Sequence, residues 1–235
     1  MQVVILVGGL GTRLRGSIPE SLAKPMAPVN GRPFLEYVLD RALAQGADEF
    51  VMLSGHASAS VQGHFGDSYG GIPVRYSAEP APLGTGGAVR NAGDLLRPEF
   101  VLLNGDTYAE VDFGELIARL DDAPLTLTLV EVDDTGRFGR VAVAGGTVVG
   151  LDEKGVPGPG LINAGVYGCA RELLELMPDT ARVSLENDVL VPRLPELSPS
   201  FVIASPVFFD IGVPADYEAA KQYFLQRESR PGSAR

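Results

Sequence analysis

A glycine-rich turn comes directly after the first apolar run of the chain, VVILV at residues 3–7. Gly8, Gly9 and Gly11 have no side chain, so a phosphate could approach the backbone N–H groups closely. Two familiar phosphate-binding patterns do not fit. The Walker pattern requires Gly-Lys-Ser/Thr after a four-residue spacer, and the dinucleotide pattern requires a third glycine where Leu14 stands. A tight turn is therefore the simpler interpretation of the glycines alone.

Three polar side chains change that balance in favour of a phosphate site. Thr12 adds a hydroxyl donor, and Arg13 adds a permanent cation whose planar head can bind two phosphate oxygens. Lys24, in AKPMAPVNGRP, supplies a second cation and is followed by Pro25. We expect these residues to bind a phosphate-containing ligand.

Two aspartates are candidates for holding a metal ion beside such a ligand. Asp106 and Asp210 each follow an apolar run, so each could lie at the carboxyl end of a strand, where open α/β folds bind ligands. For Asp106 the alternative is equally strong, because Asn104-Gly105 between apolar residues is also a good hairpin turn. Asp210 could begin a turn, but an acid directly after two phenylalanines is costly to bury without a partner or a metal.

Other reactive residue types carry no comparable pattern. The single cysteine, Cys169, excludes an intrachain disulfide framework and is best interpreted as a small buried residue. His56 and His64 lie in one polar segment without metal-ligand spacing, and we interpret them as surface or packing residues. Thr85, in PLGTGGA, could cap a helix. Taken singly, these residues predict no site.

Composition limits the class of partner. The 235 residues are 45% hydrophobic and 21% charged, and the net charge is −11 with a pI near 4.6. No cluster of Lys and Arg is present, so nucleic acid and anionic membranes are not expected partners. No signal peptide or stretch of transmembrane length is found, and we expect a cytoplasmic protein.

Strand-like and helix-like segments alternate in the first half of the chain, which predicts an α/β doubly wound sheet. The predicted strands are 3–7, 49–55, 72–78 and 99–106, and the predicted helices are 33–46, 57–66 and 85–96. The second half is richer in strands, with 125–132, a hairpin within 139–155 around Gly145-Gly146, 161–169, and a strand or bent strand at 201–212. Helices are expected at 170–177, 184–194 and 214–228. This pattern favours one domain, 1–228, with a β-rich insertion and a flexible tail at 229–235.

The sequence resembles the sugar-1-phosphate nucleotidylyltransferases. The likeness is carried by GGLGTRL and KPMAPVNGRPFLEYVL near the start, and it continues through EPAPLGTGGAV, VLLNGD, EK, NAGVYG, SLENDVL and FFDIGVPADY. It covers nearly the whole chain in the expected order, and within the family it is most similar to the short heptose-1-phosphate guanylyltransferases. Two departures from the family pattern are Ala23 before Lys24, where proline is usual, and the spacer LRGSIPESLA.

The resemblance implies a Rossmann-like mixed sheet of the nucleotide-diphospho-sugar transferase type, similar to GT-A folds, with a β-rich sugar-binding insertion. Residues 1–110 would mainly bind the nucleotide and 111–228 the sugar phosphate. It also implies catalytic roles for Arg13, Lys24 and Asp106, and Mg²⁺ binding by Asp106 and Asp210. The nucleotide-binding residues that it implies are Leu6, Gly8, Gly9, Gly11, Thr12, Arg13, Glu79, Gly84, Thr85 and Gly87. The implied sugar-phosphate residues are Asn104, Gly139, Glu153, Lys154, Asn163 and Glu186.

The implied reaction joins a nucleoside triphosphate and a sugar 1-phosphate to give an NDP-sugar and pyrophosphate. GTP and D-glycero-α-D-manno-heptose 1-phosphate are the favoured substrates, since Glu79 stands where many relatives have glutamine and could accept from a guanine N1–H and amino group. Uridylyl, thymidylyl or cytidylyl transfer to a hexose or N-acetyl sugar 1-phosphate is the nearest alternative. A choline- or amine-phosphate cytidylyltransferase and a non-catalytic sugar-nucleotide sensor stay open. A homo-oligomer is also possible.

Overall fold

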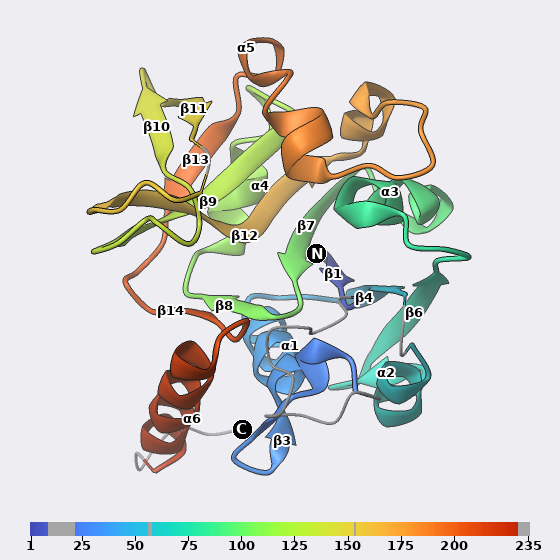
Figure 1. Ribbon diagram of the computed structural model, residues 1–235. Helices are drawn as coiled ribbons and strands as arrows, with labels where there is room; N and C mark the ends of the chain where they lie inside the picture. The colour runs from blue at the N-terminus through green and yellow to red at the C-terminus, as the bar shows by residue number, and fades with distance from the viewer. Residues whose placement is uncertain (9–21, 56–57, 153, 230–235) are drawn as a thin grey trace.

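The computed structural model describes residues 1–8, 22–55, 58–152 and 154–229, which form a ten-stranded mixed sheet with helices on both faces (Figure 1). Four parallel strands lie in the order β6 (Ile72–Ala78), β4 (Glu49–Ser54), β1 (Gln2–Leu6) and β7 (Glu99–Asn104). The helices of this half are α1 (Phe34–Ala44), α2 (Ser58–Phe65) and α3 (Gly84–Asn91), followed by a 3₁₀ turn at Gly93–Leu95. Short strands β2 (Pro28–Val29), β3 (Arg32–Pro33) and β5 (Ser68–Tyr69) complete it. The predicted α/β doubly wound sheet is confirmed.

The second half of the chain extends the same sheet. The strand order continues from β7 through β12 (Gly160–Ala170), β9 (Leu125–Val132), β13 (Ser200–Ile203) and β11 (Thr147–Leu151) to β10 (Val141–Ala144). β12 runs antiparallel to both of its neighbours, β7 and β9. The β-rich segment is thus a continuation of the central sheet, which places its residues beside those of the first half.

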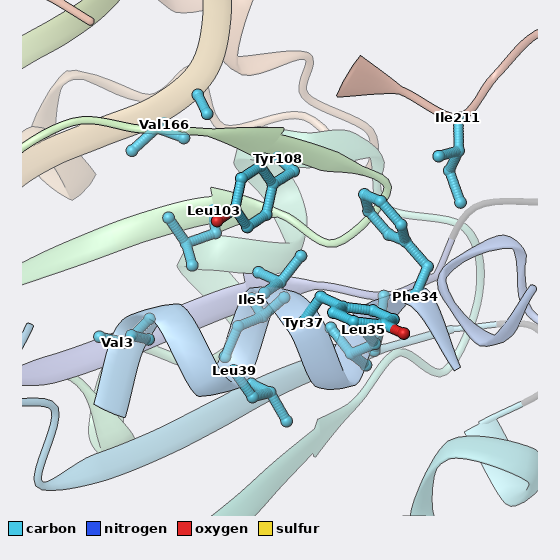
Figure 2. Packing of buried hydrophobic residues seen from close by; sticks show 14 of the residues in the cluster. Val3, Ile5, Phe34, Leu35, Tyr37, Leu39, Leu103, Tyr108, Val166 and Ile211 are labelled. Atoms are coloured by element: carbon cyan, nitrogen blue, oxygen red, sulfur yellow. The ribbon is translucent and has the colours of Figure 1, made fainter. Parts of the chain in front are cut away.

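The continuous apolar run of β1 is explained by burial on both faces of the sheet. Val3 and Ile5 pack against α1 with Phe34 and Leu39, as Figure 2 shows, whereas Val4 belongs to the cluster on the opposite face. All five side chains are fully buried. Such two-sided burial is what a central parallel strand requires.

Several local predictions are confirmed and several are corrected. The hairpin at Gly145-Gly146 joins β10 to β11, with both glycines at positive φ, as a tight two-residue turn requires. The segment predicted as a helix at 170–177 is a 3₁₀ helix, η4 (Arg171–Leu176), and 184–194 contains a π-helical turn, η5 (Leu185–Leu190). The predicted strand 201–212 is two strands, because the chain leaves the main sheet after β13 and forms β14 (Phe208–Asp210).

Three further elements complete the second half. The short helix α4 (Phe113–Ala118) was not predicted; its one turn and a half is too short for a clear helical period, although the Asp112 side chain accepts from Glu115 N and caps it. The others are α5 (Leu194–Leu197) and the closing helix α6 (Pro214–Glu228), which was predicted. Of the expected tail, residues 230–235 lie outside the described residues.

The hairpin interpretation of Asn104-Gly105 is wrong. The strand after this turn, β8 (Thr107–Ala109), does not pair with β7; it pairs with β14, and Asp210 faces Thr107 in that register. The turn therefore directs the chain out of the main sheet at the carboxyl end of β7. Because β4 and β6 lie on one side of β1 and β7 on the other, this is also the topological switch point, where α/β sheets form a ligand crevice.

Close packing of α4 on β12 gives a test of the fold. A Cβ atom added at Gly168 of β12 would lie 2.5 Å from the carbonyl oxygen of Leu116, so the helix must shift. We expect Gly168→Ala to lower the free energy of unfolding by about 1–3 kcal/mol, as overpacking does. Gly63→Ala is the matched control, since an added Cβ on this exposed position of α2 meets no atom within 4 Å. Urea unfolding of both variants checks this; equal stability of Gly168→Ala and the wild type would contradict the packing.

Candidate active site

Two cavities open at the carboxyl ends of β1 and β7, and Asn104 lines both. The larger has a volume of about 620 Å³ and the smaller about 140 Å³. Asp106 lines the larger cavity and Asp210 the smaller, so the two cavities adjoin where these acids meet. Two ligands could therefore bind side by side with their reacting ends at this junction.

Lys24 joins the two acids at the junction. Its Nζ donates to Asp106 Oδ2 at 2.6 Å and to Asp210 Oδ1 at 3.2 Å. The three side chains are 13%, 32% and 27% exposed, so the cluster is shielded but reachable from solvent. One ammonium thus faces two carboxylates, which leaves negative charge for a further cation to neutralise.

Three elements from distant parts of the chain position this cluster. Lys24 begins a 3₁₀ turn (Lys24–Met26) with Pro25 in its first turn, and Asp106 lies in the turn between β7 and β8. Asp210 ends β14, and the antiparallel pairing of β14 with β8 brings it next to Asp106. The bond from Ile211 N to Asp106 O, 3.1 Å long, continues that pairing.

Gly212 allows the cluster to close. Its N–H donates to Asp210 Oδ1 at 2.8 Å. A Cβ atom at this position would lie 2.8 Å from both Asp210 Oδ1 and Lys24 Nζ. No larger residue fits there without displacing the ion pair.

Glu79 presents a carboxylate to the larger cavity beside the end of β1. The Glu79 N–H donates to Ser54 O, so the hydrogen bonding between β6 and β4 continues one residue beyond the end of β6. The Glu79 Oε2 accepts from Leu83 N at 2.8 Å. Its Oε1 lies against the backbone of Gly8 and Gly55, because a Cβ atom built on either glycine would lie 3.2 Å from this oxygen. Within the described part of the chain, Oε1 accepts no hydrogen bond, so it can accept one from a ligand.

The start of α3 forms an adjacent part of the wall. Gly84 and Thr85 line the larger cavity, as do Leu6 and Gly8, whereas Gly87 does not. Gly87 is buried and donates to Val183 O at 3.1 Å. Thr85 does not cap its own helix; its Oγ1 accepts from Leu185 N and so holds the first residue of η5.

Polar groups predicted for the sugar phosphate gather in the smaller cavity. Asn104, Lys154, Asn163 and Glu186 all line it, while Gly139 does not and donates to Thr135 O instead. The remaining predicted site residues, Gly9, Gly11, Thr12, Arg13 and Glu153, lie outside the described residues, and so does His56.

Aromatic residues that sequence analysis did not single out also line the smaller cavity. Tyr167 accepts a hydrogen bond from Asn163 Nδ2 at 2.8 Å, and burial, together with the nearby charge of Glu186, raises the pKa of its phenol above the ordinary value. Its O–H therefore stays a proton donor at neutral pH. Phe138 and Phe208 form another wall, with ring centres 5.6 Å apart. Their apolar character gave no signal of a site, because aromatic residues in strand-like segments usually indicate core.

Arg182 was also missed. It lines the larger cavity although it lies more than a hundred residues beyond Glu79 in the chain. No motif marks it, and only the packing of its segment on α3 brings it to this wall.

No membrane-spanning element is seen: among residues 1–8, 22–55, 58–152 and 154–229, no helix has both the length and the apolar character to cross a bilayer.

Comparison with known proteins identifies related sequences over nearly the whole chain. The family model described as nucleotidyl transferase matches residues 2–227. The D-glycero-alpha-D-manno-heptose 1-phosphate guanylyltransferase of Aneurinibacillus thermoaerophilus is 37% identical, over 94% of this chain and 97% of its own. The protein of that name from Campylobacter jejuni is 36% identical, over 92% of this chain and 97% of its own.

Solved structures agree with the fold. HddC from Yersinia pseudotuberculosis, 34% identical, superposes with a TM-score of 0.81 over 95% of this chain and 99% of its own, and it has also been crystallised in a complex with GMP-PN. A putative glucose-1-phosphate thymidylyltransferase from Bacillus anthracis, 20% identical, has a TM-score of 0.83 and shares the fold. On the family match along nearly its full length, this chain belongs to the nucleotidyl transferase family.

Proposed function

We propose that this protein is a guanylyltransferase that forms a GDP-heptose and pyrophosphate from GTP and D-glycero-α-D-manno-heptose 1-phosphate. The observation that carries the proposal is the junction of the two cavities at Lys24, Asp106 and Asp210. The names of the two heptose-specific relatives and the complex of HddC with GMP-PN support the choice of substrates.

The two cavities suggest how the substrates are divided between the halves of the chain. With the exception of Arg182, the described residues that line the larger cavity lie between positions 6 and 106, and this cavity would hold the nucleotide. Most residues that line the smaller cavity lie between 138 and 210, and this cavity would hold the sugar phosphate. The Asn163 amide, the Tyr167 hydroxyl and the Glu186 carboxylate suit sugar hydroxyls, which both donate and accept. Lys154 suits a phosphate.

The reaction at the junction is a single displacement. An oxygen of the sugar 1-phosphate forms a bond to the α-phosphorus of GTP, and the bond from that phosphorus to the bridging oxygen breaks as pyrophosphate leaves with the electron pair. Both reactants are anions in a protein of net charge −11, so positioning and neutralisation of charge dominate the barrier. Lys24 would orient the transferring phosphate from between the two acids.

The donor set at the junction fits Mg²⁺. Magnesium in phosphate-transfer sites is commonly held by one or two carboxylates together with substrate phosphates and water. Asp106 and Asp210 are two such carboxylates, held within hydrogen-bond distance of one ammonium. The ion, when bound there, would supply the positive charge that allows the two anions to approach.

A nucleotide panel tests the proposed substrates. GTP, UTP, dTTP, CTP and ATP are each combined with heptose 1-phosphate, mannose 1-phosphate and glucose 1-phosphate, and pyrophosphate release is measured. We expect GTP with heptose 1-phosphate to give the highest kcat/KM, since Glu79 can accept from the N1–H and amino group of guanine. A preference for UTP or dTTP would reject the guanylyl assignment. Tight binding of a sugar nucleotide without turnover would instead indicate a sensor.

Removal of either carboxylate should stop the reaction without unfolding the chain. We expect Asp106→Asn and Asp210→Asn to lower kcat by roughly 100-fold or more, as loss of a charge-stabilising group at a reacting centre does. The melting temperature should change little, and EDTA should abolish wild-type turnover until Mg²⁺ is restored. Asp121→Asn, an exposed acid in the loop between α4 and β9, is the control and should keep wild-type rates. Near-normal turnover of Asp106→Asn would remove it from the proposed metal site.

Gly212→Ala tests the geometry of the ion pair with the charges retained. The added methyl would lie 2.8 Å from Lys24 Nζ and Asp210 Oδ1, so it must push these groups apart. We expect kcat to fall at least about tenfold, because small displacements of reacting groups are expensive. Gly63→Ala should keep full activity. Wild-type turnover of Gly212→Ala would show that the arrangement of Lys24 and Asp210 is not needed for the reaction.

A further inference from the structure

Arg182 is held at the wall of the larger cavity by a backbone that is fixed on both sides. Val183 N donates to Leu83 O, and Val183 O accepts from Gly86 N and Gly87 N. On the other side, the guanidinium of Arg90 in α3 donates to the carbonyl oxygens of Pro178 and Thr180. The segment from 178 to 185 is therefore anchored along α3, and Figure 1 shows it there in orange.

The guanidinium of Arg182 is free to bind a ligand. Within the described residues it makes no hydrogen bond or ion pair, and the residue is exposed. It is also the one cation among the described residues that line the larger cavity, where the other charged groups are Glu79 and Asp106. A permanent cation whose stem packs beside a cavity, and which has no partner among the described residues, is available to donate to an acceptor on a ligand.

Arg182 belongs to the end of the cavity that is remote from the reacting centre. A Cβ atom built on Gly84 would lie 3.3 Å from Arg182 Cγ, so the arginine stem lies against the start of α3. Pro80, Ala81 and Pro82 provide apolar surface in the same wall, next to Glu79. In Figure 1, α3 and the orange segment lie at the upper right, whereas β8 and β14, the pair beside the acid cluster, lie left of the centre and lower. Since the α-phosphate must reach that cluster, the base must lie toward Arg182.

We propose that Arg182 determines guanine specificity by donating to O6 and N7 of the base, while Glu79 accepts from N1–H and the amino group. The inference rests on the proposed use of GTP. The two side chains are complementary to adjacent edges of guanine: a carboxylate only accepts, and a guanidinium only donates. An arginine paired with O6 and N7 is the commonest specific contact to guanine in major-groove recognition, and the same two acceptors are present on the free nucleotide. Adenine, which presents an amino group at position 6, would face the guanidinium with a donor.

The test compares GTP with 7-deaza-GTP, which lacks the N7 acceptor, in the wild type and in Arg182→Ala. We expect Arg182→Ala to lower kcat/KM for GTP by roughly 10- to 100-fold, the range for loss of a bidentate contact to guanine. In the wild type, 7-deaza-GTP should be a clearly poorer substrate than GTP. In the variant, the two nucleotides should be used almost equally, because the group that senses N7 is gone.

Two controls make the result decisive. Arg193→Ala removes an arginine whose ion pair is with Glu196, away from the cavity, and it should keep the wild-type ratio of GTP to 7-deaza-GTP. Arg182→Met retains most of the apolar stem and replaces Arg182→Ala in the comparison if the alanine variant does not fold.

The outcomes separate this inference from the proposed function. An unchanged ratio of GTP to 7-deaza-GTP in the variant, or an equal loss for GTP and UTP, would overturn the inference, because the arginine would then contact phosphate or ribose or nothing. Wild-type preference for a triphosphate other than GTP would reject the proposed function itself.

Discussion

Repulsion between anions is the constraint on which the arrangement of this protein depends. Lys24 Nζ lies 2.6 Å from one carboxylate and 3.2 Å from another, and these groups come from positions 82 and 186 residues further along the chain. In a protein of net charge −11, a site for two phosphates cannot depend on general positive charge. Such a site has to be built locally, from a few cationic side chains held at one point and from carboxylates that can bind a further cation.

The sheet makes this local arrangement possible. Leu6 of β1 is paired with Asn104 of β7. In the sheet, β7 lies on one side of β1, and β4 followed by β6 lies on the other side. The crevice of the switch point therefore opens above these two strand ends. The second half of the chain adds β12 directly beside β7, so the smaller cavity adjoins the larger one instead of forming in a separate domain. Two ligands can then meet at Asn104.

The proposed base specificity and the proposed chemistry depend on different parts of this framework. The acid cluster depends on β8 and β14, a two-stranded pair outside the main sheet. The wall that would hold the base depends on α3 and the segment that docks on it through Val183. Solved structures named for other nucleotides share the fold of this chain.

Local residue patterns alone were enough to predict much of the fold. The apolar runs of β1, β4 and β7 predicted strands of a doubly wound sheet, and Gly145-Gly146 predicted the hairpin of β10 and β11, because periodicity and turn chemistry are properties of neighbouring residues. The candidate acids were also visible, since each follows an apolar run. What a local pattern does not contain is the identity of the partner across space.

The tertiary structure therefore decided the remaining questions. Whether Asn104-Gly105 formed a hairpin depended on the partner of β8, which lies a hundred residues away in β14. That same pairing brings Asp210 to Asp106 and both to Lys24. Arg182 and Tyr167 reach their cavities only through contacts with α3 and β7, and no sequence pattern near them records those contacts. Local sequence determines which surface a segment buries, but the free energy of packing among distant segments determines which residues meet.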